Sequence, residues 1–390
     1  MKKNIFLFLF FTVFVAFSQK QKDSIAFYLK NAKGVNKFLY LKRAVLLSEE
    51  LKIDSLIKQT SIEYAKQSYL IKDTLGLTFS KNKLLNHFQL TKDSFSLAKA
   101  YHLEALNHKI KNNLDSTFYY YHKSKNVSLA LKDSIEIGRR LLSMAIIQVK
   151  ELDFLGCEIT TIEGLKYIEP IKEYRTLISL YQTLGNALGN LKKPKEARDY
   201  YIKAKEITKF NNVKYRREKN YLNLLSNIGM TYKDEGNLIK ATSLFKEGLN
   251  YDSLDIKYPE QYQVLLGNLS SIYFREGKTD KAIEGYKKVL KSRIKSKNLY
   301  SQSVSHCFLT EAYLKKKKYS LAKKHANQGL ALAHKTRNNK QILMFYKFLS
   351  ELTKGEKAKK YLENYIKLSD SLFTRERNLK NQFAKVRYET

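Results

Sequence analysis

Seven histidines are the side chains of this sequence best suited to metal binding or to proton transfer near neutral pH. They are His87, His102, His108, His122, His306, His325 and His334. None belongs to a His-Glu-x-x-His pattern, which would place two ligands on one helical face. His102 and His108 are six positions apart and so lie on different faces of a helix. We expect surface or partly packed histidines and no metal site.

Other catalytic signatures are missing from the sequence as well. It has no Cys-x-x-Cys pair, no Gly-x-Ser-x-Gly elbow, no glycine-rich phosphate loop and no kinase signature. Acidic pairs such as Glu49-Glu50 and Asp234-Glu235 are adjacent, so on a helix their carboxylates point in different directions. The chain is therefore predicted not to be an enzyme and to need no cofactor.

The two cysteines, Cys157 and Cys307, are predicted to be free thiols. They are 150 residues apart, which is about four periods of the 40-residue helical repeat described in the next paragraph. Neighbouring helices pack about 8–10 Å from one another. That separation far exceeds the ~7 Å between Cα atoms that a disulfide allows. A buried thiol instead behaves as a compact apolar side chain.

An internal repeat is the strongest pattern in the sequence. Small residues occur in pairs twelve positions apart, and the pairs step along the chain by 40, 40, 44, 41 and 40 residues. The pairs are Ala105/Thr117, Ala145/Cys157, Gly185/Ala197, Gly229/Ala241, Ser270/Ala282 and Thr310/Ala322. Two further columns of residues accompany the pairs. The residue four positions after the second member of each pair is, in order, Tyr121, Thr161, Tyr201, Phe245, Tyr286 and Ala326. The residue three positions further on is Ser124, Gly164, Ala204, Gly248, Val289 and Gly329. Small residues let two helix backbones approach closely, and the larger residue fills the space between them. The pattern predicts a stack of antiparallel helix pairs.

Turn residues divide this stack into units. We predict degenerate capping helices over residues 19–92, six repeats within 93–340, a shortened repeat over 341–368 and a last helix over 369–390. The expected internal turns are at Asn112-Asn113, Leu155-Gly156, Pro194, Gly236-Asn237 and Gly277-Lys278. In the last helix, Leu368, Leu372, Leu379 and Val386 follow a seven-residue rhythm. This rhythm fits the start of a coiled coil, which would allow a homodimer, and equally an amphipathic capping helix.

The N-terminus has the features of a secretory signal. Lys2 and Lys3 precede an apolar run from Ile5 to Phe17, and Ser18 follows. Thirteen residues are too few to span a bilayer, which needs ~20, but they suit a signal peptide over residues 1–18. The protein is therefore predicted to be exported to the periplasm. An uncleaved anchor and secretion across the envelope are the alternatives.

The formal net charge of +35 raises the question of an anionic partner. The lysines are spread over nearly every predicted helix, which favours solvated faces. Attraction to a polyanion or an acidic membrane surface is the alternative. Predicted export argues against nucleic acid as the partner.

Several units resemble the tetratricopeptide repeat. The unit Leu225-x-x-Ile228-Gly229-x-x-Tyr232, followed by Gly236, Ala241, Phe245 and Gly248, is similar to the family pattern Trp-x2-Leu-Gly-x2-Tyr with later Ala, Phe and Pro. The units around Gly185 and Ser270 are similar too. The resemblance implies an all-α, right-handed superhelix of helix pairs that binds a protein or peptide without catalysis.

The sequence also departs from this pattern. It has no tryptophan, the closing proline is absent or displaced, and the period is 40–44 residues instead of 34. We expect the extra residues, such as Asn211 to Lys219, to lengthen the second helix of a pair and the loop after it.

The array and its C-terminal sequence, Lys367 to Phe373 and Phe383 to Thr390, resemble the periplasmic sensory half of bacterial regulators with a transmembrane span and a cytoplasmic helix-turn-helix or histidine-kinase module. This resemblance implies signal transduction through a membrane-bound partner. The sequence stops at Thr390, before any span.

In the resembled family the first helix of each pair lines the binding groove. The residues placed there by register with Gly185, Gly229 and Ser270 are Gln182, Asn186, Asn190, Asn223, Asn227, Lys233, Asn268 and Arg275. Amide side chains both donate and accept, so this row can pair with the backbone of an extended peptide. The alternative is a polar surface without a ligand. The family's carboxylate clamp is not expected, because Gln182, Val264 and Asn268 stand where its cations should be.

Overall fold

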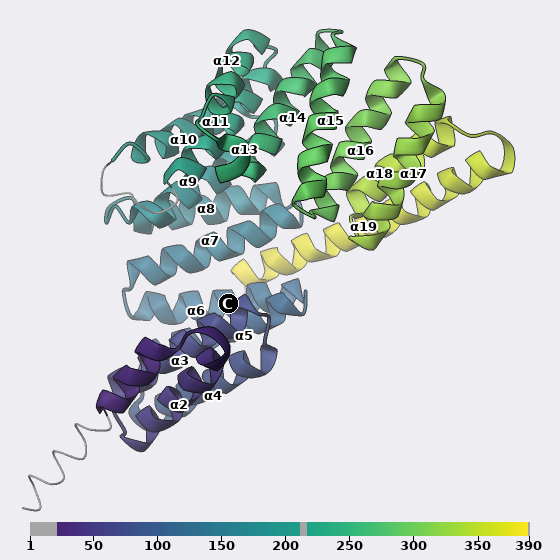
Figure 1. The fold of residues 1–390 in the computed structure, drawn as a ribbon. Coiled ribbons are helices and arrows are strands. Elements are labelled where there is room, and N and C mark those ends of the chain that lie inside the picture. The colour runs from purple at the N-terminus through teal and green to yellow at the C-terminus, as the bar shows by residue number, and fades with distance from the viewer. Residues whose placement is uncertain (1–21, 211–216, 389–390) are drawn as a thin grey trace, which may run out of the picture. The chain divides into compact units, whose positions relative to one another are not determined.

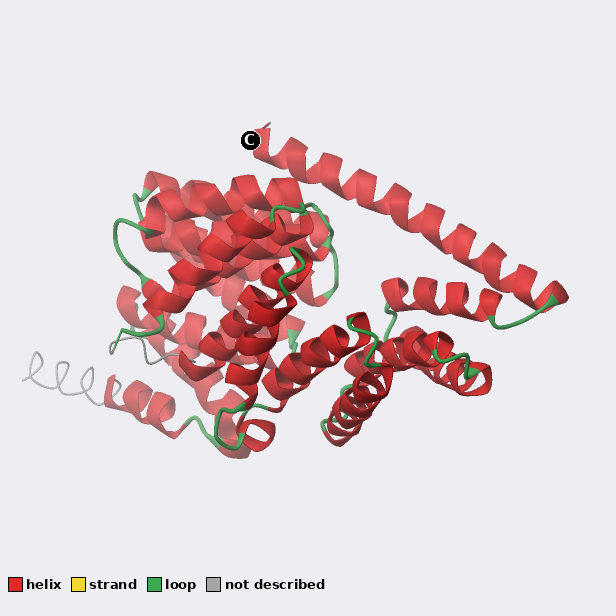
Figure 2. Ribbon diagram, turned by 90° about the horizontal axis from the view of Figure 1, so that it is seen from above, coloured by secondary structure: helices red, strands yellow, loops and turns green. Residues whose placement is uncertain are grey.

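The computed structural model describes residues 22–210 and 217–388. The predicted signal peptide (1–18) lies outside these residues, as does most of the segment from Asn211 to Lys219. Figure 2 shows only helices and loops among the described residues. The predicted all-α fold is confirmed. No described helix combines the length and the apolar character needed to cross a membrane.

The helices belong to two compact units. The first comprises the described residues of Met1–Ile147, Glu163–Ile171 and Gln382–Thr390, and the second those of Gln148–Ile162 and Lys172–Asn381. The first unit contains a helix at residues 22–31, the 3-10 helix η1 (Gly34–Asn36), α2 (Lys37–Glu50), α3 (Asp54–Leu70), α4 (Thr74–Thr91), α5 (Ser94–Ile110) and α6 (Leu114–Ala130). The second contains α9 (Tyr174–Asn190), α10 (Pro194–Ile207), α11 (Arg217–Asp234), α12 (Leu238–Leu249), α13 (Leu254–Lys257), α14 (Pro259–Arg275), α15 (Thr279–Lys295), α16 (Leu299–Lys315), α17 (Tyr319–Lys335) and α18 (Asn339–Glu351). Helices α7 (Ser134–Lys150), α8 (Phe154–Ile168) and α19 (Gly355–Tyr388) contribute residues to both units.

Within each unit, helices that follow one another in sequence pack side by side (Figure 1). In the second unit the first helices of neighbouring pairs also touch, α11 against α14 and α16 against α18. This contact places the same register positions of successive pairs next to one another, which is the arrangement that the predicted binding row requires.

Helix length explains the long repeat. Nine described helices have 17 residues each, namely α3, α5, α6, α7, α9, α14, α15, α16 and α17. Two such helices with their short turns give a period near 40 residues. The second helices are not all lengthened as expected: α6, α15 and α17 have 17 residues, whereas α10 and α12 have 14 and 12.

The turns between helices share one backbone conformation. A residue with φ between 51° and 63° recurs every 20 positions at Lys52, Lys72, Lys92, Asn112, Lys132, Leu152, Lys172 and Lys192. After the 17-residue helix α3, for example, Lys72 donates its backbone N–H to the Tyr69 carbonyl (3.1 Å) and Asp73 to the Ser68 carbonyl (2.8 Å). This pair of bonds is a Schellman motif, which satisfies the last carbonyls of the helix. The turn expected at Leu155-Gly156 is therefore at Leu152, and Leu155 and Gly156 lie inside α8.

The residue that follows each of these positive-φ residues often caps the N-terminus of the next helix. Asp73 Oδ1 accepts from the backbone N–H groups of Leu75 and Gly76, both at 3.0 Å. Asp133 accepts in the same way from Glu136 (3.1 Å). A helix stop and a helix start are thus joined in two residues, and this compact junction fixes the 20-residue spacing.

Replacing Lys132 by Gly should stabilise the protein by roughly 1 kcal/mol, because a left-handed φ of 55° strains any residue with a Cβ atom. Lys132→Ala keeps the Cβ and is the matched control, so it should show no comparable gain. Chemical denaturation of both variants measures the effect. An equal midpoint for Gly and Ala at this position would contradict the proposed strain.

The small-residue pairs lie in the helix contacts, as predicted. All twelve paired residues are buried. A Cβ built on Gly185 would come within 2.5 Å of the Tyr201 ring, and one on Gly229 within 2.4 Å of the Phe245 ring. The aromatic residue sixteen positions on therefore occupies the space that each glycine leaves open.

The residues seven positions after each small-residue pair, such as Gly248 and Gly329, contact the following pair of helices. A Cβ on Gly248 would meet Leu265 of α14 at 2.7 Å, and a Cβ on Gly329 would meet the Phe345 ring of α18 at 2.1 Å. Contacts of the same kind thus hold helices together both within a pair and between pairs.

Gly229→Ala should destabilise the protein by about 1–2 kcal/mol, because the buried Phe245 ring has no room to withdraw. Gly267→Ala is the matched control: it is also inside a helix, but its Cβ would meet nothing within 4 Å. This variant should gain roughly 0.5–1 kcal/mol from helix propensity. Opposite shifts of the unfolding midpoint are expected, and shifts of the same sign would refute the packing role of Gly229.

Candidate functional site

The eight residues of the predicted binding row lie on three first helices of the second unit. Gln182, Asn186 and Asn190 are on α9, Asn223, Asn227 and Lys233 are on α11, and Asn268 and Arg275 are on α14. All eight are partly or fully exposed. We call the five on α11 and α14, with the polar residues they bond, the amide ladder.

Hydrogen bonds between α11 and α14 form the amide ladder. Gln261 donates through Nε2 to Asn223 Oδ1, and Asn268 donates through Nδ2 to Ser226 Oγ, both at 3.0 Å. The partners are 38 and 42 residues apart, which is about one repeat. Part of the polar capacity of this row therefore serves to hold neighbouring pairs together.

The other end of the amide ladder carries its positive charge. Lys233 Nζ donates to Ser271 Oγ (3.0 Å), and Arg275 Nη1 donates to the Lys233 carbonyl (2.8 Å). Desolvation lowers the pKa of Lys233, and the charge of Arg275 adds to this effect, while Asp234 opposes it. An approaching carbonyl or carboxylate oxygen would find two cations here.

The residues on α9 form a separate group. Asn186 Oδ1 accepts from the Tyr201 hydroxyl (2.7 Å), and Asn190 Nδ2 donates to the Asn186 carbonyl (2.8 Å). These bonds stay within the α9–α10 pair, so the structure shows the α9 residues and the amide ladder as two stretches of polar surface.

Two amides of the row remain available. Gln182 and Asn227 are partly exposed, and among the described residues neither side chain has a hydrogen-bond partner. Their neighbours in the row are held in place by the bonds above. Each free amide can therefore offer a donor and an acceptor from a positioned surface.

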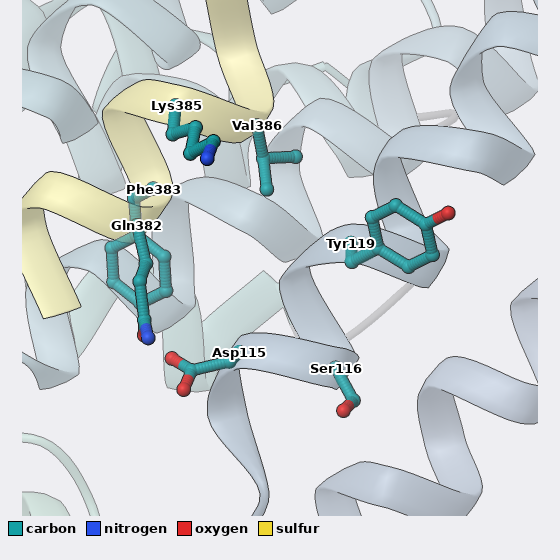
Figure 3. Close-up of a pocket in the computed structure, with 7 residues that line it drawn as sticks. All are labelled: Asp115, Ser116, Tyr119, Gln382, Phe383, Lys385 and Val386. Carbon is teal, nitrogen blue, oxygen red and sulfur yellow. The ribbon is translucent and has the colours of Figure 1, made fainter. Parts of the chain in front are cut away.

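A pocket that the repeat pattern does not predict lies in the first unit. It has a volume of about 280 Å³ and is lined by the beginning of α6 and the end of α19 (Figure 3). Its lining residues are Asp115, Ser116, Tyr119, Gln382, Phe383, Lys385 and Val386. The mixture of carboxylate, hydroxyl, amide and ammonium groups could hold a small polar molecule.

Packing of the chain's own C-terminal residues forms this pocket. The Phe383 ring is 1% exposed and stacks on Phe118 at 4.5 Å between centroids. Figure 3 shows the Gln382 amide directed at Asp115; with its nitrogen on that side it donates to both carboxylate oxygens, at 2.6 and 2.7 Å. The predicted coiled-coil pattern did not include Phe383, and this residue packs against Phe118 of the same chain. Helix α19 also runs unbroken through residue 368.

Three histidines are more deeply buried than expected. His87, His122 and His306 are 4%, 3% and 8% exposed, so the expectation of surface or partly packed side chains was wrong for them. The Nδ1 atoms of His306 and His325 are 2.9 Å apart, at hydrogen-bond distance. Burial and the nearby His325 lower the pKa of His306 to about 4. The described residues contain no group of three potential metal ligands.

The cysteines behave as predicted. Cys157 and Cys307 are free and buried, and burial raises the pKa of each thiol to about 12. At neutral pH both remain protonated, so neither is a reactive nucleophile.

The neutral His306 should make stability fall in acid. Its pKa is about 4 when folded and near 6.5 when unfolded, so the unfolded chain binds more protons between these values. Stability should therefore decrease as pH falls from about 6.5 to 4, by on the order of 3 kcal/mol from this residue. Denaturation at several pH values measures it. His306→Gln should flatten the dependence, and an unchanged slope would rule out this contribution.

The geometry described above is that of a helical-repeat protein with polar surfaces on its first helices. Residues 178–211 and 265–293 match the tetratricopeptide repeat family. These segments contain two of the three units that resemble the family in sequence. None of the curated proteins compared matches the chain.

Solved structures share the fold at low sequence identity. The apo form of the quorum sensor NprR from B. thuringiensis is 13% identical, with a TM-score of 0.61 over 90% of this chain and 99% of that chain. A Rap protein complexed with competence and sporulation factor is 15% identical, with a TM-score of 0.52 over 95% and 99%. A STAND signal transduction ATPase with a tetratricopeptide repeat sensor, from Pyrococcus horikoshii, is 16% identical, with a TM-score of 0.58 over 94% of this chain. The match spans about half (55%) of that ATPase.

Proposed function

We propose that this protein is a non-catalytic scaffold that binds a protein or an extended peptide across the first helices of its second unit. The observation that carries the proposal is the pair of free amides, Gln182 and Asn227, within a row whose other members are fixed by hydrogen bonds. Backbone groups of an extended peptide offer the matching donors and acceptors at regular spacing.

The fold neighbours support this class of function. The Rap protein was solved with competence and sporulation factor, and NprR is described as a quorum sensor. Both are covered almost completely by the match. A helical-repeat fold of this length is therefore suited to recognition of a ligand.

A second candidate is a sensory role, in which ligand binding regulates a separate membrane-bound signalling partner. The tetratricopeptide repeat sensor of the STAND protein favours it, because that sensor belongs to a signal transduction protein. Export to the periplasm is part of both proposals and rests on the N-terminal sequence from Lys2 to Ser18.

The double variant Gln182→Ala/Asn227→Ala tests the binding row. These substitutions break no hydrogen bond of the described structure, so the melting temperature should be unchanged. The protein captured by wild-type bait from an extract of the cells that make it should be reduced about tenfold, the equivalent of one or two lost hydrogen bonds. Quantitative mass spectrometry of the pull-downs measures this.

Asn250→Ala/Asn378→Ala is the matched control, because both residues are exposed amides outside the row. It should retain the partner in full. Equal retention by the two double variants would remove the site assignment, and the absence of any specific partner of the wild type would remove the proposed function.

A further inference from the structure

The last helix carries apolar residues on two of its sides. Helix α19 is one unbroken helix of 34 residues (Figure 2). One side packs on its own chain, since Tyr361 and Leu368 lie against the buried cluster around Phe345 and Leu379 is 8% exposed. Leu368 and Leu379 belong to the predicted coiled-coil rhythm, so that rhythm marks a side of α19 that the chain itself covers.

A second apolar stripe lies on a different side of α19. Leu362, Ile366 and Phe373 are 51%, 51% and 69% exposed. They are four and seven positions apart, so at 3.6 residues per turn they fall within about 40° of one another. We call these three residues the outer stripe. Large apolar side chains aligned along one side of an exposed helix are typical of a surface that another helix covers.

The outer stripe is presented by a helix that is already held in place. Besides the packing of Tyr361 and Leu368, Arg375 Nη2 lies 3.3 Å from Glu151 Oε2 of the same unit. A partner of the outer stripe therefore does not have to order α19, which removes one of the usual costs of association.

The outer stripe is complementary to itself when two copies of α19 lie antiparallel. The positions on this side of the helix alternate in steps of three and four residues, and they are Lys359, Leu362, Ile366, Ser369, Phe373 and Glu376. Placing Ile366 of one copy opposite the small Ser369 of the other sets the register. Leu362 then lies opposite Phe373, and the same layers recur in reverse order beyond the centre. Such a contact uses one surface twice, as a two-fold symmetric dimer requires.

The charges at the two ends of the outer stripe favour this direction. In the antiparallel register Lys359 lies opposite Glu376 of the second copy, at both ends of the contact. A parallel pair in register would instead bring Lys359 against Lys359 and Glu376 against Glu376, and like charges repel. Within the chain, Lys359 Nζ is 3.8 Å from Glu356 Oε1 and its side chain is 65% exposed. An ion pair so exposed contributes little, so Lys359 can turn to another carboxylate at small cost.

The flank of this contact adds little to it. Beside the seam Glu356 comes near Arg377 of the second copy, which is of opposite charge, and Glu363 comes near Asp370, which is of like charge. One pair of helices is also a small interface. The dimer is therefore expected to be weak, with a Kd on the order of 10 µM.

We propose that the outer stripe of α19 docks on the outer stripe of a second copy of this chain, with the two helices antiparallel. Leu362, Ile366 and Phe373 form the apolar contact, and the two pairs of Lys359 with Glu376 fix its direction. The site is separate from the binding row, and each dimer would carry two such rows.

Sedimentation equilibrium of the mature chain tests the proposal, and at concentrations up to about 100 µM it should show a monomer–dimer equilibrium. Ile366→Glu places a charge in the apolar contact of both copies, so it should raise the Kd about 100-fold or more and leave the chain monomeric. Ile239→Glu on α12 is the matched control, because Ile239 is 85% exposed and lies outside the outer stripe. It should change the Kd less than about twofold.

Both residues are at least half exposed, so neither variant should lower the melting temperature. A wild-type chain that stays monomeric over this range would overturn the proposal. So would an equal loss of the dimer in the two variants, because the association would then involve some other surface.

Charge exchange tests the antiparallel direction. Lys359→Glu should raise the Kd about tenfold, because it sets two carboxylates against each other at both ends of the contact. Lys359→Glu/Glu376→Lys should restore the wild-type Kd, since both ion pairs form again with their charges reversed. A Kd that is unchanged in the single variant, or not restored in the double variant, would refute the assigned contact.

Discussion

The close contact between a glycine or another small residue and an aromatic ring is the interaction on which this structure depends. Where Gly229 lacks a side chain, the Phe245 ring lies against the backbone of α11, and Tyr201 does the same at Gly185. This contact sets the distance between the two helices of a pair. Because it recurs at nearly the same spacing, the first helices of neighbouring pairs in the second unit meet in register, and polar residues one repeat apart come within hydrogen-bond distance.

The turns add a second constraint, which acts on the length of each helix. A left-handed residue followed by a capping residue reverses the chain within two or three positions, so the helix cannot shift along its partner without losing the contacts of the small residues. The backbone is strained at these turns, because residues with a Cβ atom occupy the left-handed conformation. Eight of the twelve non-glycine residues at positive φ among the described residues are lysines. A lysine at the end of a helix interacts favourably with the helix dipole, which offsets part of that strain.

The sequence predicted the fold well because the packing is local and periodic. The columns of small residues mark contacts between helices adjacent in the chain, and all of them proved to be buried. Helix lengths were harder to predict, because left-handed lysines such as Lys72 and Lys132 are not recognisable as turn residues. The burial of His87 and His306 depends on neighbours from other helices, and the docking of Phe383 on Phe118 joins positions far apart in sequence. The binding row was placed from register alone, and register could not reveal which of its amides would already be paired.

The positive charge of the protein has several separate uses, which argues against a single extended anionic partner. Many lysines occupy helix ends, and others pack on aromatic rings, as Lys42 and Lys83 both do on Phe79. Exposed cations of this kind are screened by salt and attract anions without selectivity. Selective recognition requires cations that are held in place and partly removed from water. Lys233 of the amide ladder meets this condition, because it donates to Ser271 Oγ and desolvation lowers its pKa.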